Sequence, residues 1–150
     1  MSIPNSTLVI DRETHTIRIT RDFTAPSAQI FDAWTQPEHV SAWWDPDGAP
    51  LAACDIDLKV GGSFKFVTQA QPEQPFAGIY REIAPPDRLV FETMGSTGRV
   101  LLQESVGQTH MTVEIQCRSA EQLEQFLKWG IHEGTAQTLD NLVAYAQRWR

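Results

Sequence analysis

The chain has 150 residues, of which 41% are hydrophobic and 21% are charged. This length suits a single domain with one sizeable core, and this composition excludes disordered and fibrous proteins. The formal net charge is -7, and the three lysines, Lys59, Lys65 and Lys128, form no basic run. Binding to nucleic-acid phosphates or to an anionic membrane surface is therefore not expected.

The cysteines and the first residues predict a cytoplasmic protein. Cys54 and Cys117 do not make the disulfide framework of a small secreted domain, and a reducing compartment suits them. Residues 1–6 contain neither the basic nor the apolar segment of an export signal. No apolar run reaches the roughly 20 residues that a membrane helix needs.

The first part of the chain predicts a strand pair followed by two helices. Residues 16–23 alternate between apolar and polar side chains, which is typical of a strand with one solvated face, and residues 8–10 are expected to pair with them. Pro26 suits the first turn of a helix, and Trp34 lies on the apolar stripe of that helix. A second, shorter helix begins near Pro37.

A block of strands separated by turns comes next. Direct hairpin connections at intervals of 8–12 residues predict an antiparallel sheet. Residues 95–98, of sequence GSTG, are expected to form one of the turns. The predicted strands cover residues 51–58, 63–68, 76–83, 89–94, 100–106 and 110–118.

The last 30 residues predict helices. Ser119 is a good N-cap for a helical stretch over residues 121–129, which Gly130 interrupts. Residues 131–149 are predicted to form a long helix with one apolar stripe. The order of elements indicates an α+β fold in which a meander sheet covers that stripe and leaves a ligand cavity against it. The stripe consists of Ile131, Thr135, Leu139, Leu142, Ala146 and Trp149.

Several familiar site motifs are absent, so neither a metal nor a cofactor is predicted. His132 and Glu133 begin like a zinc-protease helix, but Ala136 stands where the second histidine ligand is needed. The acidic residues between 45 and 57 lack the spacing of a calcium loop, and no phosphate-binding loop is present. A catalytic thiol is not expected at Cys117, because it alternates with apolar residues on its strand.

Four ordered blocks of the sequence resemble bacterial homologues of the C-terminal domain of the activator of the ninety-kDa heat-shock chaperone ATPase (Aha-type). This family is part of the START-like SRPBCC superfamily. The resemblance implies a helix-grip fold over residues 1–150, with a curved antiparallel sheet of about six or seven strands around a long C-terminal helix. Residues 1–15 would be an N-terminal extension or an extra strand. The blocks are residues 21–44 (RDFTAPSAQIFDAWTQPEHVSAWW), 57–66 (DLKVGGSFKF), 78–91 (GIYREIAPPDRLVF) and 130–142 (GIHEGTAQTLDNL).

Three functional hypotheses follow, and no catalytic residue is assigned. The first is binding of a small apolar or aromatic ligand between sheet and C-terminal helix, with Tyr80 and His132 orienting it by hydrogen bonds. The second is a chaperone-associated or stress-response interaction module. The third is a cyclase- or hydrolase-type enzyme that uses His132 or Glu114 as acid or base in the same cavity. The protein is expected to be a monomer or a homodimer. The predicted cavity lining is Trp44, Phe66, Tyr80, Phe91, Trp129 and His132.

Overall fold

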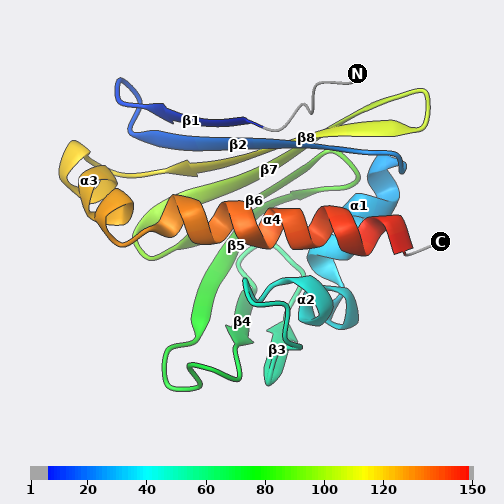
Figure 1. Cartoon of the computed structure of the whole chain (residues 1–150), viewed down its shortest axis with the longest axis horizontal. Coiled ribbons are helices and arrows are strands. Elements are labelled where there is room, and N and C mark those ends of the chain that lie inside the picture. Colours follow the sequence, from blue (N-terminus) through cyan, green and yellow to red (C-terminus); the bar gives the residue numbers. More distant parts are fainter. Residues whose placement is uncertain (1–6, 149–150) are drawn as a thin grey trace.

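The computed structural model describes residues 7–148 and has an α+β architecture (Figure 1). One antiparallel sheet contains all the strands in the order β1-β2-β8-β7-β6-β5-β4-β3. The sheet is curved and does not close. Its strands are β1 (Thr7–Asp11), β2 (Thr16–Phe23), β3 (Ala53–Ile56), β4 (Ser63–Val67), β5 (Phe76–Ala84), β6 (Arg88–Thr93), β7 (Ser96–Ser105) and β8 (Gln108–Gln116). The helices are α1 (Ser27–Thr35), α2 (Pro37–Trp43), α3 (Ala120–Lys128) and α4 (Ile131–Arg148).

The sheet has eight strands, slightly more than the six or seven that the resemblance implies, and the pairing expected between residues 8–10 and residues 16–23 is confirmed. The strand β1 (Thr7–Asp11) forms a hairpin with β2. The register runs from Thr7 opposite Thr20 to Asp11 opposite Thr16. The strand predicted over residues 16–23 is confirmed. Its alternation places Ile17 and Ile19 in the core with no exposed surface.

The long C-terminal helix lies across the concave face of the sheet, as the helix-grip prediction requires (Figure 1). Arg21 of β2 ties the two together: its Nε donates to Asp140 Oδ1 at 2.9 Å, and its Nη2 donates to the Ala136 carbonyl at 3.3 Å. At the other end of the helix, Tyr145 and His39 of α2 share a hydrogen bond of 2.5 Å. These contacts fix the helix over the sheet.

Two details of the prediction change for local reasons. The turn expected at residues 95–98 is shorter, because Met94 and Gly95 both adopt positive φ (54° and 74°) and β7 already begins at Ser96. The strand expected over residues 51–58 is limited to Ala53–Ile56. The expected break at Gly130 is confirmed: Gly130 has φ 74° and separates α3 from α4.

Trp149, which the sequence assigns to the apolar stripe of the last helix, lies outside the described residues. Within residues 7–148, no helix is both long and apolar enough to cross a membrane.

Candidate functional site

An apolar cavity of about 320 Å³ lies between the concave face of the sheet and the first half of α4. Small-molecule sites in proteins start at roughly this volume and are mostly apolar. The inward-facing positions of β6, β7 and β8 form one wall, and α4 forms the opposite wall. Trp34 and Trp44 lie at one end, and the junction of α3 and α4 lies at the other. The cavity is therefore built by elements from the whole length of the chain.

Gly134 makes room for the cavity on the helix side. The residues of α4 that line the cavity, including Ile131, Thr135 and Thr138, follow the three- and four-residue steps of one helix face. Gly134 lies on this face, and a Cβ added to it would meet no atom within 4 Å. Glycine in a helix interior costs about 1 kcal/mol relative to alanine. The helix thus carries a destabilising residue where a side chain would project into empty space.

Gly98 has a different role on the sheet side. A Cβ at Gly98 would lie 2.4 Å from Cε2 and 2.6 Å from Cζ of Phe91, well inside van der Waals contact. The two residues are register partners on β7 and β6, and both line the cavity. A glycine within a strand often marks such a close approach. Here the missing side chain leaves room for the Phe91 ring beside Gly98.

The hydroxyl groups of the cavity wall are already engaged with the backbone. Thr135 Oγ1 donates to the Ile131 carbonyl at 2.7 Å, and Thr138 Oγ1 donates to the Trp44 carbonyl at 3.1 Å. On the sheet, Thr93 Oγ1 donates to the Ala77 carbonyl at 2.6 Å, and Ser96 Oγ donates to the Thr93 carbonyl at 2.8 Å. The wall therefore presents mostly apolar surface despite these four hydroxyl side chains.

A narrow recess of about 10 Å³ continues the cavity into a cluster of aromatic rings. Trp34, Trp44, Phe76 and Phe91 line both spaces, whereas Tyr80 lines the recess. Most of the rings pack edge-on or tilted: the centroids of Trp44 and Phe66 are 5.0 Å apart, and those of Phe64 and Tyr80 are 5.1 Å apart. Such rigid aromatic packing keeps the recess narrow.

The structure brings five of the six residues predicted from the sequence to these two spaces. Trp44, Phe91 and Trp129 line the cavity, and Phe66 and Tyr80 line the recess. His132 lines neither. It lies at the edge of the lining face of α4, since at about 100° per residue it falls roughly 20° from Leu139 and roughly 60° from Thr135 around the helix. Its Nδ1 is buried and has no hydrogen-bond partner among residues 7–148.

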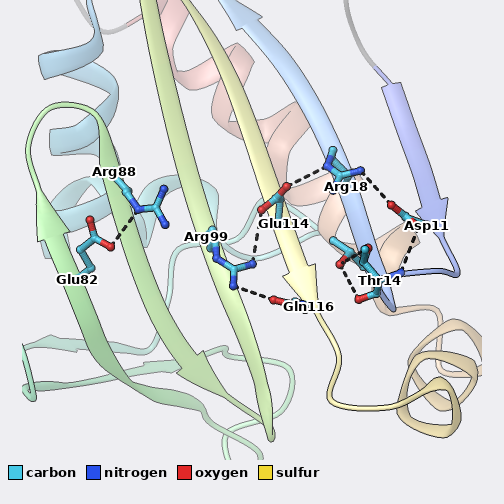
Figure 2. Close-up of polar contacts among 9 residues, drawn as sticks. Asp11, Thr14, Arg18, Glu82, Arg88, Arg99, Glu114 and Gln116 are labelled. Atoms are coloured by element: carbon cyan, nitrogen blue, oxygen red, sulfur yellow. Dashed lines mark hydrogen bonds and ion pairs between the residues drawn. The ribbon is translucent and has the colours of Figure 1, made fainter.

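Glu114, the second acid–base candidate, has its carboxylate on the outer face of the sheet. Its neighbours Val113 and Ile115 line the cavity, so alternation along β8 turns the Glu114 side chain to the opposite side. Figure 2 shows the carboxylate between two arginines: Arg18 Nε lies 2.9 Å from Oε2, and Arg99 Nη1 lies 3.6 Å from Oε1. This carboxylate serves an ion-pair network across β2, β8 and β7 and does not face the cavity.

Cys54 on β3 is half-buried, and this burial raises the pKa of its thiol to about 11 from an ordinary value of 9.0. The thiolate is the nucleophilic form. At pH 8 the raised pKa leaves about a hundredfold less thiolate than in an unfolded chain. We therefore expect iodoacetamide to modify Cys54 about a hundredfold more slowly in the folded protein than in the urea-unfolded protein at pH 8.

Peptide mass spectrometry would measure that rate for Cys54 separately from Cys117, whose pKa is also raised by burial. The rate should still increase above pH 10. A plateau below pH 9 would contradict the raised pKa and would reopen the case for a reactive thiol.

Among the described residues, no group of three or more histidine, cysteine and carboxylate side chains is placed to hold a metal ion.

Most of the chain matches the model of a known protein family. The family model described as Activator of Hsp90 ATPase homolog 1-like protein matches residues 24–147. That range begins after β2 and includes every residue that lines the cavity. No curated protein matches the chain.

Several solved structures share the fold. Protein Ms6760 from Mycobacterium smegmatis is 24% identical, with a TM-score of 0.80 over 97% of this chain and 99% of that one. Protein NE0264 from Nitrosomonas europaea is 24% identical, with a TM-score of 0.81 over 93% and 97% of the two chains. A protein from Rhodobacter sphaeroides is 16% identical, with a TM-score of 0.83 over 97% and 100%. At these identities the similarity shows the fold.

Proposed function

Because the chain belongs to the Activator of Hsp90 ATPase homolog 1-like family, whose START-like fold suggests a ligand-binding domain, we propose that it binds a small apolar molecule in its cavity. The observation that carries this proposal is the volume of about 320 Å³ with an almost entirely apolar wall. Moving apolar surface from water into such a space is favourable by about 25 cal/mol per Å². Each wall also keeps a glycine where a side chain would reduce the space.

The entrance in this proposal lies beside Trp129 and Met94. Both side chains line the cavity and both are exposed, by 60% and 49%. Gln122 of α3 links the two sides of this entrance, since its Nε2 donates to the Met94 carbonyl at 3.0 Å. Its Oε1 accepts from the Arg118 backbone N–H at 2.8 Å. A ligand would pass between the β6–β7 turn and the α3–α4 junction.

The inner end of the site in this proposal is the aromatic recess. Tyr80 lines it, and burial raises the pKa of the Tyr80 hydroxyl, so this group stays neutral. The rings of Trp44 and Phe91 line both cavity and recess and would supply most of the contact area of an aromatic ligand. His132, which lines neither space, has no part in the proposed site.

The test is a titration with N-phenyl-1-naphthylamine, an uncharged dye whose emission increases in apolar surroundings. We expect saturable emission with one dye bound per chain. Competition by an uncharged, non-fluorescent aromatic compound should reverse the increase. A signal that grows linearly with dye and never saturates would show non-specific adsorption and would contradict the proposal.

A further inference from the structure

The indole N–H of Trp34 is a buried donor without an acceptor. Trp34 lies on α1, is 7% exposed and lines both the cavity and the recess. Its Nε1 is buried and has no hydrogen-bond partner among residues 7–148. Leaving such a donor unpaired is unfavourable, because the group loses its hydrogen bond to water and gains none in the protein. Neighbouring Trp43 shows the usual arrangement, since its Nε1 donates to the Ala33 carbonyl at 3.0 Å.

The recess beside Trp34 has the size of a single oxygen atom. Its volume of about 10 Å³ is close to the smallest space that holds one water molecule. A ring or a branched group does not fit there, whereas the oxygen of a carbonyl or hydroxyl does. The four hydroxyl groups of the cavity wall already donate to backbone carbonyls. Besides the Tyr80 hydroxyl, which also lines the recess, the buried Nε1 of Trp34 is thus the side-chain donor that a bound oxygen would satisfy.

The charges around the site favour a neutral oxygen over a carboxylate. In the described part of the chain, no lysine, arginine or histidine lines the cavity or the recess. The one acidic lining residue, Glu114, has its carboxylate paired with Arg18 and Arg99 on the outer face (Figure 2). A ligand carboxylate at the inner end would be a buried charge without a counter-ion, which is strongly unfavourable.

We propose that the ligand is an uncharged, mainly apolar molecule with a carbonyl or hydroxyl oxygen at one end, and that this oxygen accepts a hydrogen bond from Trp34 Nε1. This inference rests on the proposed function and adds the class of ligand and its orientation. The oxygen enters the aromatic recess, and the apolar body occupies the cavity toward Trp129.

Three probes of similar shape test the proposal: 2-acetylnaphthalene, 2-isopropenylnaphthalene and 2-naphthoate. The first has a carbonyl, the second has a carbon in place of that oxygen, and the third has a carboxylate. Affinities are measured by calorimetry for the wild type, Trp34→Phe and the control Phe91→Leu. We expect Trp34→Phe to reduce the preference for ketone over hydrocarbon about tenfold. Phe91→Leu should weaken both and leave that preference unchanged, and naphthoate should bind at least about tenfold more weakly than the ketone.

A second readout does not depend on any variant folding. In an NMR spectrum of 15N-labelled wild-type protein, the indole N–H proton of Trp34 should move downfield with the ketone and not with the hydrocarbon. An unchanged ketone preference in Trp34→Phe, an unmoved indole signal at saturation, or naphthoate binding as tightly as the ketone would overturn this inference. In each of those cases the cavity still binds apolar molecules. Failure of the dye and of both uncharged probes to bind would instead overturn the proposed function, and this inference with it.

Discussion

Replacing Gly134 by leucine is expected to close the cavity to ligands and to stabilise the protein at the same time. The new side chain starts from a position where a Cβ meets nothing within 4 Å, so it extends into the cavity without displacing the helix. Leucine is also a better helix former than glycine by roughly 1 kcal/mol. We expect binding of N-phenyl-1-naphthylamine to weaken by about tenfold or more. Thermal unfolding should occur about 2–4 °C higher.

Gly134→Ala is the matched control for this experiment. Alanine provides the same gain in helix propensity, about 1 kcal/mol, with a single methyl group in the cavity. The alanine variant should therefore be stabilised and should still bind the dye. The combination of higher stability with lost binding separates a filled site from a damaged fold, because damage would lower both. Wild-type dye affinity in Gly134→Leu would place the binding site elsewhere.

Much of the fold could be predicted because its signals are local. The alternation over residues 16–23 and the N-cap at Ser119, whose Oγ accepts from the Gln122 N–H at 3.1 Å, each depend on neighbouring residues in the chain. The break at Gly130 is local as well. The pairing of residues 8–10 with residues 16–23 is predictable as well, and the strand at Thr7–Asp11 makes the count eight, slightly above the six or seven that the family resemblance implies.

The candidate site was predictable in its aromatic residues and not in its details. Trp44 and Phe91 have the right parity or helix face, and the structure places them in the lining. The sequence does not show that His132 stays out of the lining, because at about 100° per residue it falls beside Leu139 and Thr135 at the edge of the lining face. Gly134 could have been recognised, because a glycine inside a helical pattern often has a packing or functional reason. The unpaired N–H of Trp34 is a property of its three-dimensional surroundings and has no counterpart in the sequence.

The residues that line the cavity include few groups that could act as acids, bases or nucleophiles. The charged side chains of Arg18, Glu114 and Arg99 are on the outer face of the sheet, where they bridge three strands (Figure 2). Burying those charges inside would be unfavourable, whereas pairing them at the surface costs little. The inner face carries mainly aromatic and aliphatic side chains, and the inward-pointing Arg21 is paired with Asp140 of α4. A site built this way holds a ligand mainly by shape and apolar contact.

Substituting Gly98 by alanine is expected to narrow the cavity from the opposite wall and to destabilise the fold. The added methyl group would lie 2.4 Å from the Phe91 ring, so the ring must leave its position beside Gly98. The open side of that ring is the cavity, which it already lines. We expect a loss of about 1–2 kcal/mol in the free energy of unfolding, measured in urea. Dye affinity should fall because the displaced ring occupies the space.

Shortening Phe91 in the same chain shows whether this contact is the cause. In Gly98→Ala/Phe91→Leu the methyl group no longer meets a ring, so the double variant should be more stable than the sum of the two single losses predicts. A coupling of about 1 kcal/mol is expected for residues in such direct contact. Strict additivity would contradict a steric conflict between the two positions. Recovered dye binding in the double variant would further show that Gly98 keeps the Phe91 ring out of the cavity. Gly98 would then be required for ligand binding and not for formation of the sheet.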